Sequence, residues 1–246
     1  MSTWTRHLYE HDPLTIAKGE SKGYSFIHKF GANFDIDTAS DPESVWTGGG
    51  LYPWSSLSTA QTIYCISTSS SDTGTLEIQG LDADYNVQTE TVTLTGTTAV
   101  TTAKTFLRIY RMFYTHTSDN IGTLTARVTS GTGTVVAQID EGYNQTLMAV
   151  YTIPAGYTGY FLCTDCTINA LRDLMLMFYI RPPQGNFRIA HLAEVRGFYR
   201  YDFPIPLRIT EKSDLDIRVD QVNFSNSRAT ANFDLILIDE RLPSNA

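Results

Sequence analysis

The stretch FGANFDIDTASDPESVWTGGGLYPW (residues 30–54) separates a polar N-terminal segment from a long series of short, evenly spaced strand patterns. Its three consecutive glycines, residues 48–50, allow the backbone to reach positive φ at little steric cost. Trp46, Tyr52 and Trp54 flank them, and a flexible linker gains nothing from such rings, so we predict a fixed loop. Two interpretations stay open: the rings cap the end of a sandwich core, or they anchor another subunit.

The composition describes a chain that folds around a real core. Of its 246 residues, 42% are apolar and 18% are charged, which suits one large all-β domain or two smaller ones. The net charge of −8 leaves no basic footprint for nucleic acid. No apolar run approaches the ~18 residues of a membrane span, and the N-terminus lacks the apolar region of a secretory signal. We therefore expect neither nucleic acid nor membrane as a partner.

Charge divides the chain into two unequal parts. Residues 1–142 carry 8 Lys and Arg against 15 Asp and Glu, whereas residues 143–246 carry 10 against 11. Two surfaces of different character are expected from this contrast. We place the boundary near Gly142.

Strand patterns dominate both parts. Thr75–Leu81 alternates apolar and polar residues, and so does the start of Asp214–Val222, where Val222 breaks the phase and suggests a bulge. Thr105–Tyr114 is apolar on both faces, which favours a central strand. Leu174–Arg181 resembles a helix in composition, but its length and the prolines that follow favour a buried strand.

Further along, Pro204 and Pro206 are expected to separate a strand over Phe198–Phe203 from another over Leu207–Thr210. About eight short strands in roughly 100 residues are typical of a sandwich or jelly roll. We predict an all-β protein with two β-sandwich or jelly-roll-like halves, namely an extended N-terminal arm (1–22), a Thr/Gly-rich sandwich (23–142) and a jelly-roll-like domain (143–246).

Motifs of catalysis and cofactor binding are missing from the sequence: it has no G-x-S-x-G, P-loop, Rossmann or H-E-x-x-H pattern. Cys163 and Cys166 form a C-x-x-C that lies inside a strand pattern, so buried strand cysteines are expected in place of a redox or zinc site. Asp35, Asp37 and Asp41 offer calcium ligands or Asx-type turns. We predict no catalytic residue, no cofactor and no metal.

Aromatic and basic residues leave two binding hypotheses open. Arg196, Arg200 and Arg208 lie near several rings and would stack on them, pair with carboxylates of a neighbour, or simply occupy the polar face of a strand. The large aromatic stock also allows an exposed platform for sugar, although aromatic residues in β proteins more often pack in the core.

Several segments resemble a family of structural proteins from the virions of tailed bacteriophages. The matching pieces cover much of the chain in order: HKFGANFDIDTASDPESVWTGGGLYPW (28–54), IQGLDADYNVQTETVTLTGTTAVTTAKTFLRIYR (78–111), GYNQTLMAVYTIPAGYTGYFL (142–162), FPIPLRITEKSDLDIRV (203–219) and FDLILID (233–239). None of them is a catalytic signature. The resemblance implies a non-enzymatic component of the virion, made in the bacterial host cytoplasm, whose place in the particle stays open.

On this resemblance we expect a capsid decoration or cement protein that acts through subunit-bridging contacts. Its partners would be its own subunits, as a homotrimer, and the major capsid protein or other virion proteins. The candidate interface residues are Trp4, His7 and Tyr9 of the arm and Trp46, Tyr52 and Trp54 of the loop. Two alternatives stay open: a tail, neck or baseplate component, and a host-surface carbohydrate-binding module.

Deleting residues 1–22 tests the role assigned to the arm. The truncated protein should fold and yet fail to bind the phage particle, because the arm is expected to dock on a neighbour. Circular dichroism and co-sedimentation with particles measure the two properties. Unchanged particle binding would remove the arm from the interface.

Overall fold

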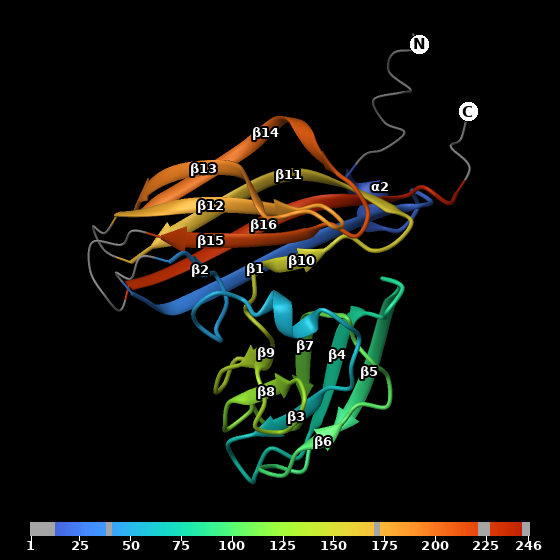
Figure 1. The fold of residues 1–246 in the computed structure, drawn as a ribbon, viewed down its shortest axis with the longest axis vertical. Helices are drawn as coiled ribbons and strands as arrows, with labels where there is room; N and C mark the ends of the chain where they lie inside the picture. Colours follow the sequence, from blue (N-terminus) through green and yellow to red (C-terminus); the bar gives the residue numbers. More distant parts are fainter. Residues whose placement is uncertain (1–12, 38–40, 170–172, 221–226, 243–246) are drawn as a thin grey trace.

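The structure is a computed structural model that describes residues 13–37, 41–169, 173–220 and 227–242. Nearly all of its regular elements are strands, which confirms the all-β class (Figure 1). A single helical turn, α2 (Pro13–Ala17), lies within the segment expected to be an extended arm, and it buries Ile16. The suspected bulge at Val222 lies outside the described residues.

Two sheets form the upper lobe in Figure 1, and every neighbouring pair of strands in them is antiparallel. The first sheet has the order β1 (Tyr24–Ile36), β16 (Ser227–Asp239), β11 (Tyr157–Ile168), β14 (Phe198–Ile209). The second has the order β10 (Val150–Thr152), β15 (Asp214–Asp220), β12 (Asp173–Arg181), β13 (Arg188–Arg196), with β2 (Glu43–Ser44) also paired to β15.

The order of these strands is that of a jelly roll. If β1 and β10 to β16 are counted from one to eight along the chain, the two sheets read 1-8-3-6 and 2-7-4-5. Eight antiparallel strands wound in this way across two sheets define the jelly-roll architecture. We call this unit, with β2, the jelly-roll lobe.

The segment between β2 and β10 leaves the jelly-roll lobe and forms a second unit, the inserted lobe (residues 54–145), drawn below it in Figure 1. It begins with a 3-10 helix, η1 (Trp54–Leu57). One small sheet has the order β6 (Val100–Thr101), β3 (Tyr64–Ser67), β8 (Leu124–Arg127), β9 (Val135–Ile139). The other has the order β5 (Val87–Thr93), β4 (Thr75–Leu81), β7 (Arg108–Thr115).

The sheets divide the chain differently from the predicted boundary near Gly142. The strands β1 and β2 lie within the predicted 23–142 unit, yet they pair with β16 and β15 of the jelly-roll lobe. An alternating pattern records which face of a strand is apolar and says nothing about its pairing partner. The chain therefore starts the jelly roll, leaves it, and returns to complete it.

Two further expectations about strands are wrong. β7 was expected to be central, but it lies at the edge of its three-stranded sheet. β14 runs unbroken through Pro204 and Pro206, although these residues were expected to end it. β14 is an edge strand, where a missing N–H costs little, and its register against β11 shifts near these prolines.

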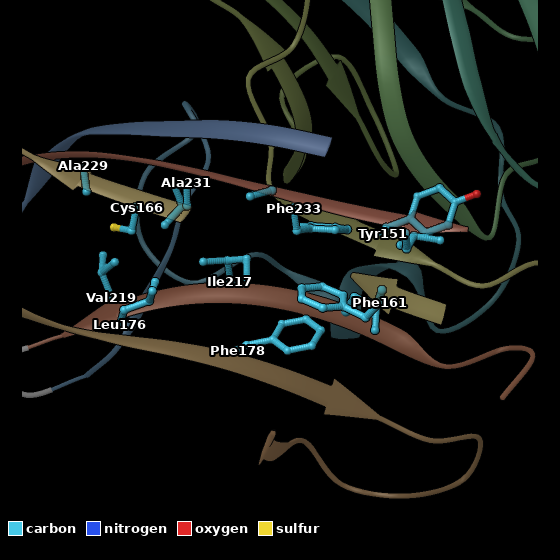
Figure 2. Close-up of a cluster of buried hydrophobic side chains, with 14 of the residues drawn as sticks. Tyr151, Phe161, Cys166, Leu176, Phe178, Ile217, Val219, Ala229, Ala231 and Phe233 are labelled. Carbon is cyan, nitrogen blue, oxygen red and sulfur yellow. The ribbon is translucent and has the colours of Figure 1, made fainter. Parts of the chain in front are cut away.

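The two sheets of the jelly-roll lobe pack face to face around an aromatic centre (Figure 2). The ring of Phe161 on β11 stacks on that of Phe178 on β12 at 4.2 Å between centroids, and it lies 5.4 Å from Phe233 on β16. All three side chains are fully buried. Residues from both sheets thus meet at Phe161.

Replacing Phe161 with alanine should lower the free energy of unfolding by about 3–5 kcal/mol, because it leaves a cavity between the two sheets. The matched control is Phe26→Ala, since Phe26 on β1 is 50% exposed and should lose far less. Denaturant unfolding followed by fluorescence measures both variants. Equal losses in the two variants would contradict the proposed role of Phe161.

Candidate interaction surface

The three rings of the Gly-rich loop lie inside the molecule. Trp46, Tyr52 and Trp54 are 3%, 1% and 6% exposed. Their rings contact one another edge to face, with centroids 5.1 Å apart for Trp46–Tyr52 and 4.7 Å apart for Tyr52–Trp54. The expected docking role does not fit this burial, whereas the core-capping alternative describes it. The rings pack in the core because the loop folds back over the inserted lobe.

The glycines allow this turn. Gly49 and Gly50 adopt φ of +71° and +58°, a region in which other residues are strained. The indole N–H of Trp46 donates to the carbonyl oxygen of Gly50 at 3.1 Å. The loop thus bonds to itself through the Trp46 side chain, an arrangement that fits the fixed loop we expected. Trp4, His7 and Tyr9, the other candidate interface residues, lie outside the described residues.

Trp54 also joins the two lobes. Its indole N–H donates to Oδ2 of Asp216 on β15 at 2.9 Å, and Arg218 Nε donates to the same oxygen at 2.8 Å. Burial raises the pKa of Asp216, and the charge of Arg218 opposes that shift. Close by, Arg108 of the inserted lobe pairs with Asp214 of the jelly-roll lobe at 2.9 Å. Buried polar contacts thus hold the inserted lobe against β15.

The exposed apolar side chains that most need a partner lie elsewhere, on what we call the β13–β14 edge (residues 188–209). The two strands are joined through Gly197, whose φ is +82°, but each extends a different sheet. Among the described strands, β13 is hydrogen-bonded to β12 alone and β14 to β11 alone. Figure 1 shows both on the side of the jelly-roll lobe away from the inserted lobe. Each strand therefore presents one unpaired backbone edge.

Large apolar side chains project from this edge into solvent. Ile205 is 83% exposed and Phe198 is 63% exposed, and Leu192 and Ile189 are about half exposed. Unpaired edge strands that carry such residues invite pairing with another chain. The sequence held a signal that our prediction did not use: Ile205 lies between Pro204 and Pro206, and prolines within sheets are found mainly on edge strands.

A cluster of rings from β13 and β14 packs beside the exposed residues of the β13–β14 edge. His191 stacks on Tyr201 at 4.6 Å between centroids, and Tyr201 meets Phe203 edge to face at 4.8 Å. The Nε2 atom of His191 lies 2.7 Å from the hydroxyl oxygen of Tyr199. Burial lowers the pKa of His191, which favours its neutral form. The cluster thus connects β13 to β14 through ring contacts and a hydrogen bond.

Two arginines of this surface pair with carboxylates within the chain. Arg200 pairs with Asp202 at 2.6 Å, and Arg196 lies 3.5 Å from Asp173. These exposed pairs contribute little to stability. They lower the local positive charge of the β13–β14 edge, which carries both exposed apolar and exposed charged side chains. Arg208 is exposed on β14.

The described residues show no candidate metal site, and their acidic loop residues are hydrogen-bonded within the chain. They contain no group of three or more His, Cys, Asp or Glu placed to hold a metal ion. In the acidic stretch, the backbone N–H of Asp35 donates to the side chain of Asn33, and that of Asp37 donates to Glu43. No described helix is long and apolar enough to cross a bilayer.

Comparisons with known proteins identify no family. No protein-family model matches the chain, and no curated protein matches its sequence. The PBSX exported protein XepA aligns at 10% identity over 85% of this chain and 84% of its own, with a TM-score of 0.19. The VP2 subviral particle of infectious bursal disease virus aligns at 10% identity over 89% and 73%, with a TM-score of 0.23. At TM-scores this low, the alignments carry no argument about fold or function.

Thiol labelling of the three cysteines tests whether the folded protein has a reactive thiol. All three are free and buried, and burial raises the pKa of Cys65 and Cys166 to about 12 and that of Cys163 to about 11. At about pH 8 the native protein should therefore react very slowly with a thiol reagent, since the thiolate is the reactive form. In guanidinium chloride all three thiols should react. Fast labelling of the folded protein would contradict this assignment.

Proposed function

We propose that this chain is a non-enzymatic structural protein of a tailed-bacteriophage virion, and specifically a capsid decoration or cement protein that acts as a homotrimer. The observation that carries the proposal is the β13–β14 edge, a surface with unpaired strand edges and exposed Ile205 and Phe198. Such a surface suits a molecule that is covered by neighbours in its working state. The sequence resemblance to virion structural proteins supports the same class.

The energetics favour an interface at this place. Burying one Leu, Ile or Phe side chain contributes roughly 1.5–3 kcal/mol relative to leaving it exposed. A neighbouring strand would also satisfy the free backbone groups of β13 or β14 by strand addition. Because four large apolar side chains lie along this edge, covering it supplies both a hydrophobic centre and backbone hydrogen bonds.

A cement protein stabilises a shell by mass action. If it binds neighbouring capsid subunits only when they are assembled, its binding free energy adds to the stability of the assembled state. The major capsid protein is thus the proposed partner, together with two further copies of this chain. A cyclic trimer joins its subunits through heterologous contacts, so the β13–β14 edge would pack against a different patch of the next copy or against the capsid protein.

The decisive experiment is co-sedimentation of the purified protein with undecorated heads of the cognate phage. Saturable, stoichiometric binding would support the decoration role. Binding to isolated tails with none to competent heads would replace it with the alternative role in the tail, neck or baseplate. Analytical ultracentrifugation of the free protein would measure the proposed trimer.

Ile205→Asp locates the interface within this experiment. A charge at this position should lower binding to heads at least about tenfold, since burying an unpaired carboxylate is costly. It should leave the fold intact, because Ile205 is 83% exposed. The matched control is Ile121→Asp, at a 53% exposed position of the inserted lobe. Equal binding by the two variants would contradict an interface at the β13–β14 edge.

A further inference from the structure

A pocket of about 250 Å³ lies where three turns from the two lobes meet. The inserted lobe supplies Trp54, Tyr85 and Arg108 to its wall. The jelly-roll lobe supplies Arg181 from the end of β12 and Lys212 from the turn before β15. This pocket shares no lining residue with the β13–β14 edge, and the proposed structural role makes no use of it.

The wall of the pocket carries more positive than negative charge. Arg108, Arg181 and Lys212 contribute three cations, and Asp214 is the single acidic residue among the lining side chains. The difference is two positive charges. A buried carboxylate can pair with two cations at once, as Asp214 does with Arg108 and Arg181, but no second carboxylate lines the wall for Lys212. The excess therefore calls for a separate explanation.

The single carboxylate is already fully engaged. Oδ1 of Asp214 accepts from Arg108 Nε at 2.9 Å and from the Thr152 hydroxyl at 2.6 Å, and Oδ2 accepts from Arg181 Nε at 2.8 Å. Asp214 is buried, so solvent cannot replace these partners. It thus holds Arg108 and Arg181 in place and has no capacity left for Lys212.

Donors remain at the pocket. The hydrogen bonds of Arg181 to described residues use Nε and Nη2, both toward Asp214, and leave Nη1 without a described partner. The ammonium of Lys212 lies 5.8 Å from the ring centroid of Tyr85 and forms no hydrogen bond or ion pair with the residues described. A guanidinium edge and an ammonium group in one wall are the donors that bind carboxylate and phosphate oxygens in proteins.

The backbone of the pocket is unusual too. Tyr85, Gln184 and Lys212 adopt left-handed φ of +67°, +59° and +60°. All three line the pocket, and left-handed residues other than glycine are uncommon. Such conformations gather at ligand-binding turns when the surrounding structure holds them. The carbonyl oxygen of Tyr85 accepts from the N–H of Ala155 at 2.9 Å, which ties its turn to the other lobe.

We propose that this pocket binds a small ligand through one oxyanion group, a carboxylate or a phosphate. Lys212 and the free edge of Arg181 hold the oxyanion, and the ring of Tyr85 contacts the rest of the ligand. Asp214 acts as a positioning residue that orients the two arginines. The volume admits one small group, such as a single acidic sugar or a phosphorylated one, and excludes a folded partner.

Isothermal titration of the full chain tests this proposal with three probes: inorganic phosphate, glucuronate and glucose. Saturable binding of phosphate or glucuronate, with none of glucose, is expected, and the stronger of the two identifies the oxyanion. Binding should weaken as salt rises, because the recognition is electrostatic. An absence of saturable binding by both anions at low salt would overturn the proposal.

Variants assign the binding to this pocket. Lys212→Met should reduce affinity for the preferred anion at least about tenfold, since it removes one charged donor. The matched control is Lys22→Met, which changes the net charge equally at an exposed position outside the pocket and should have no effect. Gln184→Glu, at the exposed rim, should weaken binding by charge repulsion and provides a second variant if Lys212→Met unfolds. Wild-type affinity in a folded Lys212→Met or Gln184→Glu protein would also overturn the proposal.

Discussion

The ladder between β1 and β16 is the constraint on which the rest of the structure depends. Tyr24 lies opposite Ile238 and Asn33 opposite Ala229, so the first and last strands of the described chain are neighbours in one sheet. The chain between β1 and β16 must therefore begin and end at the same sheet. The inserted lobe satisfies this constraint because it begins after β2 and ends before β10, where the jelly-roll strand order continues.

Buried charges then set the position of the inserted lobe against the jelly-roll lobe. Arg108 and Asp214 pair across the junction, and the buried ammonium of Lys29 on β1 donates to the carbonyl oxygen of Tyr110 on β7. Burial lowers the pKa of Lys29 well below its usual value. Such groups lose hydration on folding, which offsets much of what their pairing contributes to stability. Any displacement of the lobes would leave them unpaired, which is costly.

The distribution of aromatic and aliphatic residues between the core and the surface differs from the sequence-based expectation. Two of the largest rings, Trp46 and Trp54, fill the interior, whereas Ile205 and Leu192 face solvent. Interfaces are rich in Trp and Tyr on average, but a ring beside a glycine turn also fits a core that needs volume. The proposed interface rests accordingly on an apolar edge in which three of the four exposed side chains are aliphatic, next to the ring cluster around His191.

Local features were readable from the sequence alone. The alternation in Thr75–Leu81 predicts the strand β4 with the bounds that the structure shows, and the glycines predict the positive φ of Gly49 and Gly50, because both depend on neighbouring residues only. The pairing of β1 with β16, the burial of Trp54 and the Arg108–Asp214 contact join residues far apart in the chain. Period-two patterns carry no information about such partners, so the jelly-roll order, the apolar edge and the cationic pocket were decided by tertiary structure.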